Sequence, residues 1–284
     1  MRKLFLIACS NMRKAKGQTI AIIVLILIAA LMLNLWLMLS MDYKANFDRY
    51  HDKLNAEHVT FAVDDVDGTV YEFLSQTLGN DSKVKEYRLD SCMFMIGTFH
   101  YNGGMMNTDF VFMDKQTAVS RTIGKSEIIE DSDLQSGIYL PMLYKSNDYT
   151  VGKTIEISIG SHPVTYTICG FFNSVMLGSH NCTLTQILLT ADKYAELEEL
   201  NYAPKTTLCS VRLNDKSANL NFEATLKSTV SEYFPNTRMI GSCYDSVAQA
   251  RYISQMICSA IMGAMAFIVL LIALVVIISN IINY

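Results

Sequence analysis

The sequence predicts a membrane protein in which two transmembrane α-helices, one near each end of the chain, flank an extracytoplasmic α+β domain. Three observations predict this class. The composition is 51% hydrophobic and 18% charged, which is too apolar for a soluble domain of 284 residues. The apolar excess lies in two blocks, 19–41 and 253–282. Between the blocks, strand-like and helix-like periodicities alternate, as in a globular α+β domain.

The first apolar block contains no charge, and we predict the first transmembrane helix at 18–41. About 20 apolar residues cross the roughly 30 Å of hydrocarbon in a bilayer. A cleavable signal peptide is the alternative, but its apolar region is only about 7–15 residues long and ends in small residues. Here the longer run ends in Leu-Met-Leu-Ser-Met before Asp42, which favours a membrane anchor.

The second apolar block follows Arg251 and is also free of charge, which predicts the second transmembrane helix at 252–284. It is longer than one crossing requires, so it should tilt or project from the bilayer at one end. The preceding segment, 246–252, is able to continue this helix into the outer domain.

Basic residues set the predicted orientation. Residues 1–17 form an amphipathic lead, and positive charge before a first span marks the cytoplasmic side. The N-terminus is therefore cytoplasmic, the domain at 42–251 lies outside, and the chain is a multi-pass protein of the cell membrane. We expect the basic residues to contact anionic lipid, not nucleic acid. They are Arg2, Lys3, Arg13, Lys14 and Lys16.

The outer domain is predicted from apolar periodicity and turn signals. A half-buried strand is expected at 59–63, and further strands are expected on both sides of a hairpin turn at Asn102-Gly103-Gly104 and at 138–141, 155–159, 164–168, 185–189 and 209–213. One helix is expected to be capped by Asp67, with Val70, Phe73, Leu74 and Leu78 inward, another to be capped by Thr190, with Tyr194, Leu197 and Leu200 inward, and a third is expected at 222–234. The alternation of strands and helices indicates an α+β fold.

Cysteine usage argues against a disulfide framework. Five cysteines fall in the outer domain, an odd number whose spacings repeat nothing, although one bridge remains an alternative. Most fall in apolar runs, where free cysteine serves as a small buried hydrophobe. The five are Cys92, Cys169, Cys182, Cys209 and Cys243.

Signals for catalysis are weak, and we expect no catalytic, cofactor-binding or metal-binding residue. The segment Val151-Gly152-Lys153-Thr154 matches only the end of a P-loop, because Asn147 replaces its first glycine and a strand follows. The pair His180 and Cys182 offers one short ligand spacing where a zinc site needs two. Asn34 in the first span either bonds to a partner helix or is a single tolerated polar residue.

Several stretches resemble the FtsX/MacB-type permeases of ABC transporters. The entry to the first span reads Asn11-Met12-Arg13-Lys14-Ala15-Lys16-Gly17-Gln18-Thr19 and is similar to that family's basic lead before the first helix. Ile138-Tyr139-Leu140-Pro141, the run 151–155 and the run 166–172 are similar to its outer domain. The order of basic lead, span, large outer domain and span is also similar. The resemblance implies an outer domain of the MacB periplasmic type.

The resemblance implies a non-catalytic permease subunit. A cytoplasmic ABC ATPase would bind ATP in its place and contact the lead and the inner end of the second span, and another permease would complete a homo- or heterodimer. Movement of the outer domain would then serve export or envelope signalling. The family has four spans, whereas this sequence shows two, so it is expected to be the N-terminal part of a longer permease.

Two alternatives share the topology. A two-span receptor would carry an outer sensory domain and continue into a cytoplasmic signalling helix. A doubly anchored surface adhesin would have the same two spans, but only the topology supports it. The basic lead at 11–19 and the strands around Gly152 and Gly170 favour the permease.

Overall fold

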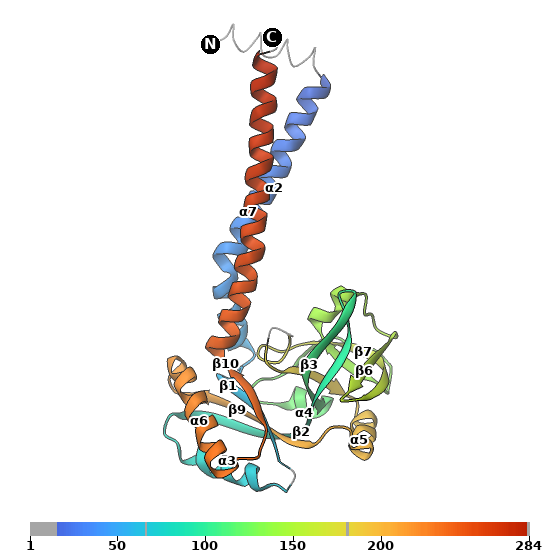
Figure 1. Ribbon diagram of the computed structural model, residues 1–284, viewed down its shortest axis with the longest axis vertical. Coiled ribbons are helices and arrows are strands. Elements are labelled where there is room, and N and C mark those ends of the chain that lie inside the picture. Colours follow the sequence, from blue (N-terminus) through green and yellow to red (C-terminus); the bar gives the residue numbers. More distant parts are fainter. Residues whose placement is uncertain (1–15, 66, 180–181, 283–284) are drawn as a thin grey trace. The chain divides into compact units, whose positions relative to one another are not determined.

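The computed structural model describes residues 16–65, 67–179 and 182–282. The chain divides into two compact units. A helical unit ends at Asn46 and resumes at Arg251, and an outer unit comprises Phe47–Ala250 (Figure 1). Each unit is described below by itself.

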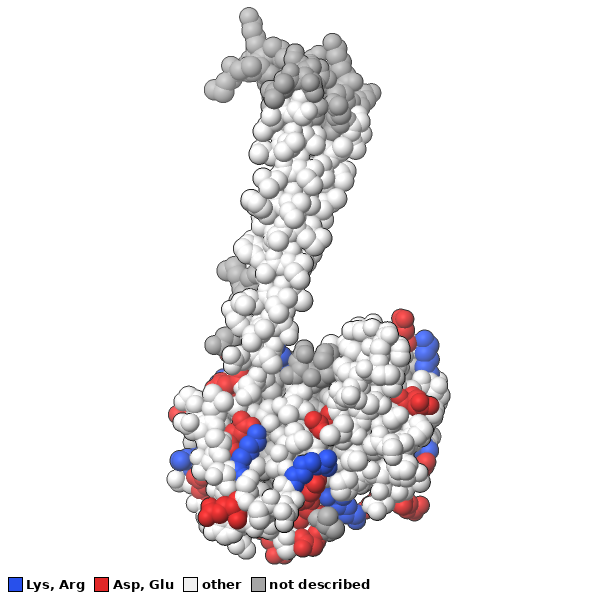
Figure 2. All heavy atoms as spheres, in the orientation of Figure 1, with Lys and Arg blue, Asp and Glu red and all other residues white. Residues whose placement is uncertain are grey.

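The helical unit consists of most of α2 (Lys16–Lys53) and α7 (Tyr244–Ile282). The apolar stretch of α2 within Ile20–Met38 has a mean hydropathy of 2.9, and 6% of it is buried. The apolar stretch of α7 within Tyr244–Ser279 has a mean hydropathy of 3.2, and 11% of it is buried. Helices so apolar and so exposed are long enough to cross a membrane and are unlike the buried core helix of a soluble protein. On the face shown in Figure 2, charged side chains gather on the outer unit.

The two helices pack through one stripe on each. On α2 the less exposed positions recur every three or four residues, which places them on one helix face. On the facing stripe of α7 the buried positions are occupied by small residues. At Gly263 an added Cβ would lie 3.0 Å from the indole Nε1 of Trp36, so glycine allows this close approach. The stripes comprise Ile22, Leu25, Ala29, Met32 and Trp36 on α2, and Gln255, Ser259, Met262, Gly263, Ala266, Val269, Ala273, Val276 and Ile277 on α7.

The outer unit is built on a 10-stranded sheet with the order β10-β1-β9-β2-β3-β8-β5-β7-β4, in which β6 joins β2 to β7. The strands are β1 (Val59–Asp64), β2 (Val84–Tyr101), β3 (Gly104–Asp114), β4 (Glu127–Glu130), β5 (Ile138–Pro141), β6 (Thr154–Ile159), β7 (His162–Asn173), β8 (Thr185–Leu189), β9 (Lys205–Leu213) and β10 (Met239–Cys243). The helices are α3 (Thr69–Asn80), α4 (Lys115–Ser120), α5 (Ala191–Leu200) and α6 (Asn219–Tyr233), with 3-10 turns η1 (Met142–Asn147) and η2 (Lys216–Ala218).

The first lobe is the sheet β10-β1-β9-β2, which uses the N-terminal half of β2. Helices α3 and α6 cover one of its faces through Leu74, Leu78 and Leu226, against Phe61 and Val211 of the strands. The other face packs on a second core that includes the end of α2 and the start of α7. The lobe is therefore buried on both faces, as a sheet between helical layers is.

The second lobe is a closed barrel, β2-β3-β8-β5-β7-β6, in which β6 pairs back onto the C-terminal half of β2. Closure depends on Gly97, where an added Cβ would lie 2.6 Å from the Ser158 carbonyl and 2.8 Å from Phe110. Only glycine lets β6 approach β2 so closely. Aromatic and β-branched side chains fill the interior, among them Phe99, Phe110 and Ile157.

Most of the expected elements are confirmed. The hairpin turns at Asn102 and Gly103, both with positive φ, and Tyr101 pairs with Gly104. The segment after Gly152 is β6, a strand and not the helix of a P-loop. The five outer-domain cysteines are free and buried. Cys182 nevertheless lies in a bend rather than a strand.

Four details of the sequence predictions are wrong. The strand at 59–63 is buried on both faces rather than one, because helical layers cover both sides. Helix α3 starts after Gly68, and the carboxylate of Asp65 accepts from the amides of Val70 and Tyr71, while Asp67 reaches only Thr69. The hydroxyl of Thr190 bonds to Gly137 instead of capping α5. Leu200 is 40% exposed, because it is the last residue of α5.

Candidate functional site

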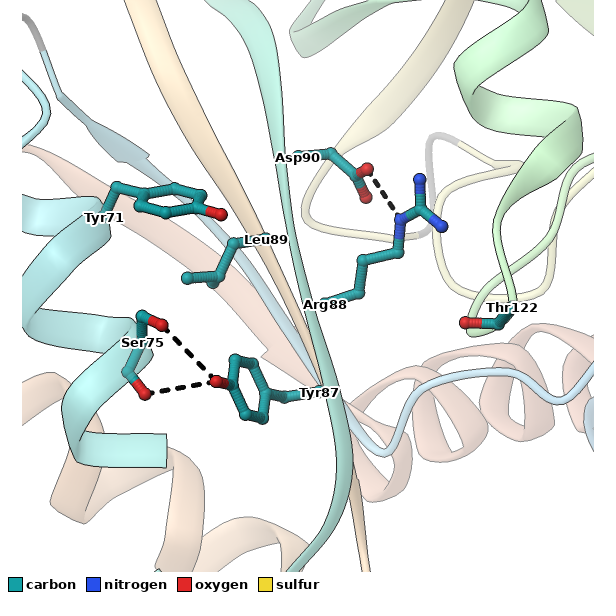
Figure 3. Close-up of a pocket in the computed structure, with 7 residues that line it drawn as sticks. All are labelled: Tyr71, Ser75, Tyr87, Arg88, Leu89, Asp90 and Thr122. Carbon is teal, nitrogen blue, oxygen red and sulfur yellow. Dashed lines mark hydrogen bonds and ion pairs between the residues drawn. The ribbon is translucent and has the colours of Figure 1, made fainter. Parts of the chain in front are cut away.

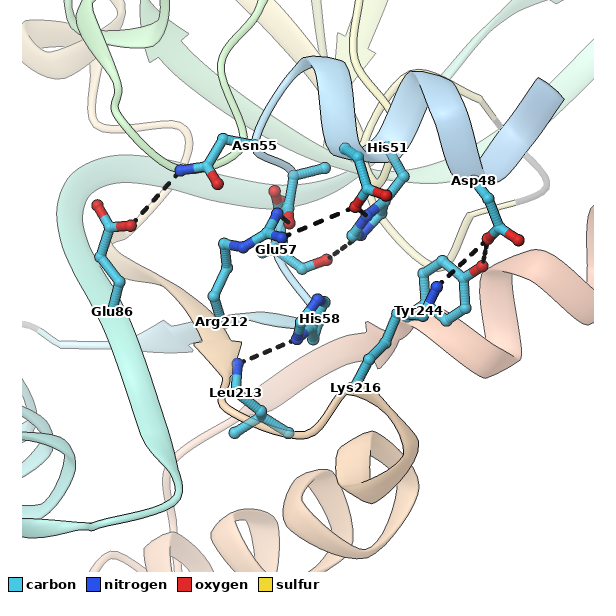
Figure 4. A network of polar contacts seen from close by, with 12 residues as sticks. Asp48, His51, Asn55, Glu57, His58, Glu86, Arg212, Leu213, Lys216 and Tyr244 are labelled. Atoms are coloured by element: carbon cyan, nitrogen blue, oxygen red, sulfur yellow. Dashed lines mark hydrogen bonds and ion pairs between the residues drawn. The ribbon is translucent and has the colours of Figure 1, made fainter. Parts of the chain in front are cut away.

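The two long helices meet the outer unit at neighbouring strands. Strands β1 and β10 are antiparallel, and Val59 pairs with Cys243. Helix α7 begins directly after β10, and α2 ends at Lys53, shortly before β1. The last part of α2 and the first part of α7 belong to the outer unit. Their attachment is the first candidate site, which we term the junction (Figure 4).

Tyr244 is the centre of the junction. Its ring lies 5.6 Å from that of Phe47 and 4.8 Å from that of His51, the latter edge-on. Its hydroxyl donates a short hydrogen bond to the carboxylate of Asp48. The ammonium of Lys216 lies 4.2 Å from the Tyr244 ring centroid and 3.4 Å from Asp48. One side chain at the start of α7 thus binds the end of α2 through packing and a hydrogen bond, and binds Lys216 of η2 through a cation–π contact.

Asn219, the fully buried first residue of α6, ties α7 to the first lobe. Its side-chain oxygen accepts from the amide of Asp245 at 3.1 Å, and its nitrogen donates to the carboxylate of Asp245 at 3.0 Å. The same nitrogen lies 2.7 Å from the Lys216 carbonyl. Asn219 therefore satisfies a free amide in the first turn of α7 and fixes where this helix starts.

Two buried histidines stack beside Tyr244. The rings of His51 and His58 are 5.4 Å apart and 9° from parallel. His51 Nε2 lies 3.0 Å from the Glu57 carbonyl, and His58 Nδ1 accepts from the amide of Leu213 at 3.0 Å. Burial lowers the pKa of His51, and burial together with Arg212 lowers the pKa of His58 to about 4. Both rings are therefore neutral near pH 7, as their stacking requires.

A buried carboxyl group, that of Glu57, lies close to the histidines. Glu57 is 1% exposed, and neither of its carboxylate oxygens has a hydrogen-bond partner among the described residues. Gly124 has a φ of +61°, and an added Cβ there would lie 2.0 Å from the Glu57 Oε2. Arg212 donates to the carbonyl of Ala56 at 2.5 Å. Gly124 is thus required both for its backbone conformation and for the space that Glu57 occupies.

The second candidate site is an open groove of about 440 Å³ on the first lobe (Figure 3). Its polar side chains are largely paired with one another. The hydroxyl of Tyr87 donates to the carbonyl of Ser75 at 3.2 Å, and Arg88 Nε donates to Asp90 at 2.7 Å. The fully buried Arg121 approaches the same carboxylate at 3.1 Å. The lining residues are Tyr71, Ser75, Tyr87, Arg88, Leu89, Asp90 and Thr122.

The predicted inner contact residues cannot be placed. Arg2, Lys3, Arg13 and Lys14 lie outside the described residues, and Lys16 is the first residue of α2. His180 also lies outside them. Among the residues that the structure describes, no group of three His, Cys, Asp or Glu side chains is arranged to hold a metal ion. The contact with the ATPase remains a prediction.

Sequence reasoning missed the junction and the groove. The junction side chains come from the segments 47–58, 212–219 and 243–245, which approach one another only in the folded sheet. The apolar periodicity near position 59 indicated a strand but not its neighbour. Two histidines close to the predicted end of the span were the only local signal, and no metal-ligand spacing drew attention to them.

Comparisons with known proteins identify similar outer domains. No family model and no curated protein matches the chain. The periplasmic region of MacB from Actinobacillus actinomycetemcomitans is similar with 9% identity and a TM-score of 0.31, over 70% of this chain and 94% of that one. The extracellular domain of the noncanonic ABC-type transporter YknZ from Gram-positive bacteria has 10% identity and a TM-score of 0.28, over 56% and 86%.

Identities of 9% and 10% with TM-scores of 0.31 and 0.28 are too low to carry an argument about this chain. The two similar structures are described as a periplasmic region and an extracellular domain. Two apolar helices flank a mixed α/β domain in this chain, as the sequence predicted. The structures to which this chain is similar are thus the periplasmic region of MacB and the extracellular domain of YknZ, and the two helices that flank its α/β domain are long and apolar enough to cross a membrane.

Proposed function

We propose that this chain is the permease-type membrane subunit of an ABC transporter, in which a cytoplasmic ATPase moves the outer domain. The ATPase binds and hydrolyses ATP, and the chain itself transmits movement without catalysing a reaction. The substrate of this movement is an extracytoplasmic molecule or partner protein. The motifs of the lead and the outer domain support the family assignment, and the junction supports the mechanism.

The junction is the observation that carries this proposal. The ends of both apolar helices lead into neighbouring paired strands, β1 and β10, with no loop between β10 and α7. Within the outer unit, Tyr244 joins Asp48 on α2 to Lys216 beside β9, and Asn219 joins α6 to Asp245. A displacement of one helix end against the other must break these contacts or move the strands with it.

The inner contact would be made by the lead. Its basic residues Arg2, Lys3, Arg13, Lys14 and Lys16 precede the first apolar helix. A second permease copy, identical or related, would pack against the helical unit. Asn34 supports this arrangement, because its amide is exposed and lies off the α2 stripe that packs on α7. In lipid such an amide is stabilised by a hydrogen bond to another helix.

The experiment is reconstitution with an ATPase. An ABC ATPase, if one is encoded by a neighbouring gene, is co-expressed with this chain, co-purified and assayed in nanodiscs. We expect deletion of 2–16 to abolish co-purification. We expect Y244F, which leaves the lead intact, to keep co-purification and to weaken the ATP-dependent change in distance between spin labels in the two lobes.

The outcomes separate the alternatives. An unchanged yield of ATPase after deletion of 2–16 would exclude the lead as the contact. An ATPase that never associates, together with a signalling module following the second span in the coding sequence, would establish the two-span receptor instead. The matched control is Y233F, which removes an exposed tyrosine hydroxyl at the end of α6, away from the junction and the groove, and should change neither measurement.

A further inference from the structure

Half of strand β2 has an open edge. Residues 93–101 of β2 pair with β3, but residues 84–92 pair with β9 alone, on one side only. Within the described ranges, no strand pairs with the other side of 86–92. An unpaired edge presents a row of backbone donors and acceptors that can template another strand.

The ladder shows which backbone groups point outward. Val211 of β9 accepts from the amide of His58, so its peptide groups face β1. In an antiparallel ladder the direction alternates along the strand, so Ser210 and Arg212 face β2. Their partners Arg88 and Glu86 face back toward β9. The backbone groups of Tyr87 and Leu89 therefore point to the open edge.

The groove follows this edge. Four consecutive residues of β2, from Tyr87 to Asp90, line it, although successive side chains of a strand point to opposite faces. Residues from both faces can line one groove only where it runs along the strand's edge. Figure 3 shows this arrangement, with Tyr71, Leu89 and Tyr87 on one side of β2 and Arg88 and Asp90 on the other.

We propose that an extended peptide binds in this groove by adding a strand to the open edge of β2 at Tyr87–Asp90. The peptide is a segment of a partner or substrate protein in which apolar and acidic side chains alternate. This binding is a property of the outer unit and holds whichever protein drives the helices. It goes beyond the proposed permease role, which leaves the outer partner unnamed.

The side chains that line the groove explain why apolar and acidic side chains should alternate in the peptide. One side of the edge offers apolar surface, including the 45% exposed ring of Tyr71 and the partly buried Leu89. On the other side, Asp90 is buried between Arg88 and Arg121, so its charge is already compensated. The side chain of Arg88 is 28% exposed and is the charge that a bound strand meets. A carboxylate there complements it.

The test measures fluorescence anisotropy of a labelled peptide, Thr-Val-Glu-Val-Glu-Val-Thr, with the full-length protein in detergent micelles. Two analogues carry N-methyl groups, one on the valines and one on the glutamates. In antiparallel pairing the residue opposite Leu89 shares its face and exchanges hydrogen bonds with it. Valine methylation should therefore weaken binding by about tenfold or more, since each net hydrogen bond is worth about 1 kcal/mol.

Side-chain recognition is tested by charge reversal. Arg88→Glu should weaken the peptide by about fivefold, as expected for a partly exposed ion pair, and should favour an analogue with lysine for glutamate. Lys153→Glu, an exposed reversal before β6, is the matched control and should change neither affinity.

Each outcome decides the proposal. If only the analogue methylated on the glutamates lost affinity, strand addition would also be supported, but in the parallel direction. Equal binding of both methylated analogues and the parent would overturn it, because no backbone pairing would then be involved. Failure of the parent peptide to bind at millimolar concentration would overturn it as well. If Arg88→Glu left the peptide affinity unchanged, the proposed preference for acidic side chains in the peptide would be wrong.

Discussion

At the residue scale, Tyr244 connects three elements of the junction, because it lies on α7 and contacts both α2 and η2. It packs on Phe47 and His51 and donates to Asp48, while Lys216 lies over its ring. Removing only its hydroxyl separates the hydrogen bond from the packing. The packing should then persist and the directional link to α2 should be lost.

Y244F should lower the free energy of unfolding of the outer unit by about 1–2 kcal/mol, because a hydrogen bond to a partly exposed carboxylate is lost. Denaturant titration of the detergent-solubilised protein, followed by near-ultraviolet circular dichroism, measures the change. Y71F is the control and should stay within about 0.5 kcal/mol of the parent. A loss of the same size in both variants would contradict a specific role for the Tyr244 hydroxyl.

The histidine pair predicts an acid-sensitive outer unit. The pKa of His58 is lowered from 6.5 to about 4, so between these values the unfolded chain binds a proton that the folded chain excludes. The free energy of unfolding should therefore decrease as the pH is lowered through this window, by at most about 1.4 kcal/mol per pH unit for each such histidine. Above pH 6.5 the ring is neutral in both states and contributes no slope.

His58→Asn tests this effect, since the amide oxygen of asparagine is able to accept from Leu213 as Nδ1 does. The variant should show a shallower decline between pH 6.5 and 4 than the parent. Denaturant midpoints at half-unit intervals of pH provide the comparison. His100→Asn, at an exposed histidine, should retain the parent slope. An unaltered slope in His58→Asn would mean that other groups cause the decline.

At the scale of elements, the close approach of α2 and α7 depends on Gly263. The only tryptophan of the chain, Trp36, contacts this position and reports on it. Gly263→Leu should displace the indole and change the emission maximum of the protein in nanodiscs. Ala260→Leu adds the same side chain at an exposed position of α7 and should leave the emission unchanged. Identical spectra for all three proteins would contradict the packing.

The exposed amide of Asn34 makes a separate prediction about association between permease copies. Asn34→Leu should shift the monomer–dimer equilibrium in nanodiscs toward monomer by about threefold, as expected for the ~0.6 kcal/mol of an interhelical hydrogen bond. Two-colour photobleaching of labelled protein counts the copies. Leu31→Ala is the control at another exposed position of α2. An unchanged equilibrium would leave Asn34 as a tolerated polar residue.

Local patterns predicted the elements but not their partners. The alternation at 155–159 and the turn at Asn102 were sufficient for β6 and the β2–β3 hairpin, because period and turn chemistry are local properties. Helix α2 continues to Lys53, beyond the predicted span at 18–41, and the apolar pattern that predicted the span carries no signal for this more polar part of the helix. Barrel closure at Gly97 and the open edge at Tyr87 depend on pairings between distant segments, which one sequence does not encode visibly.

At the scale of the whole molecule, burial of the five described thiols of the outer unit predicts that none of them forms a disulfide. Burial raises the pKa values of Cys92, Cys209 and Cys243 above the ordinary range for a thiol. In protein with serine at positions 9 and 258, a maleimide should label no cysteine in the native state and all five in denaturant without reductant. Mass spectrometry counts the labels. Fewer than five labels after denaturation would indicate a bridge.

Strand β2 belongs to both lobes, and this has a consequence for signalling across the outer unit. Its first half carries the open edge, and its second half closes the barrel at Gly97. A strand added along Tyr87–Asp90 would stiffen the first half of β2, and the second half of the same strand is part of the barrel wall. Peptide binding in the groove and bending of the barrel would then be coupled through β2. Each would affect the other without direct contact between the peptide and the barrel.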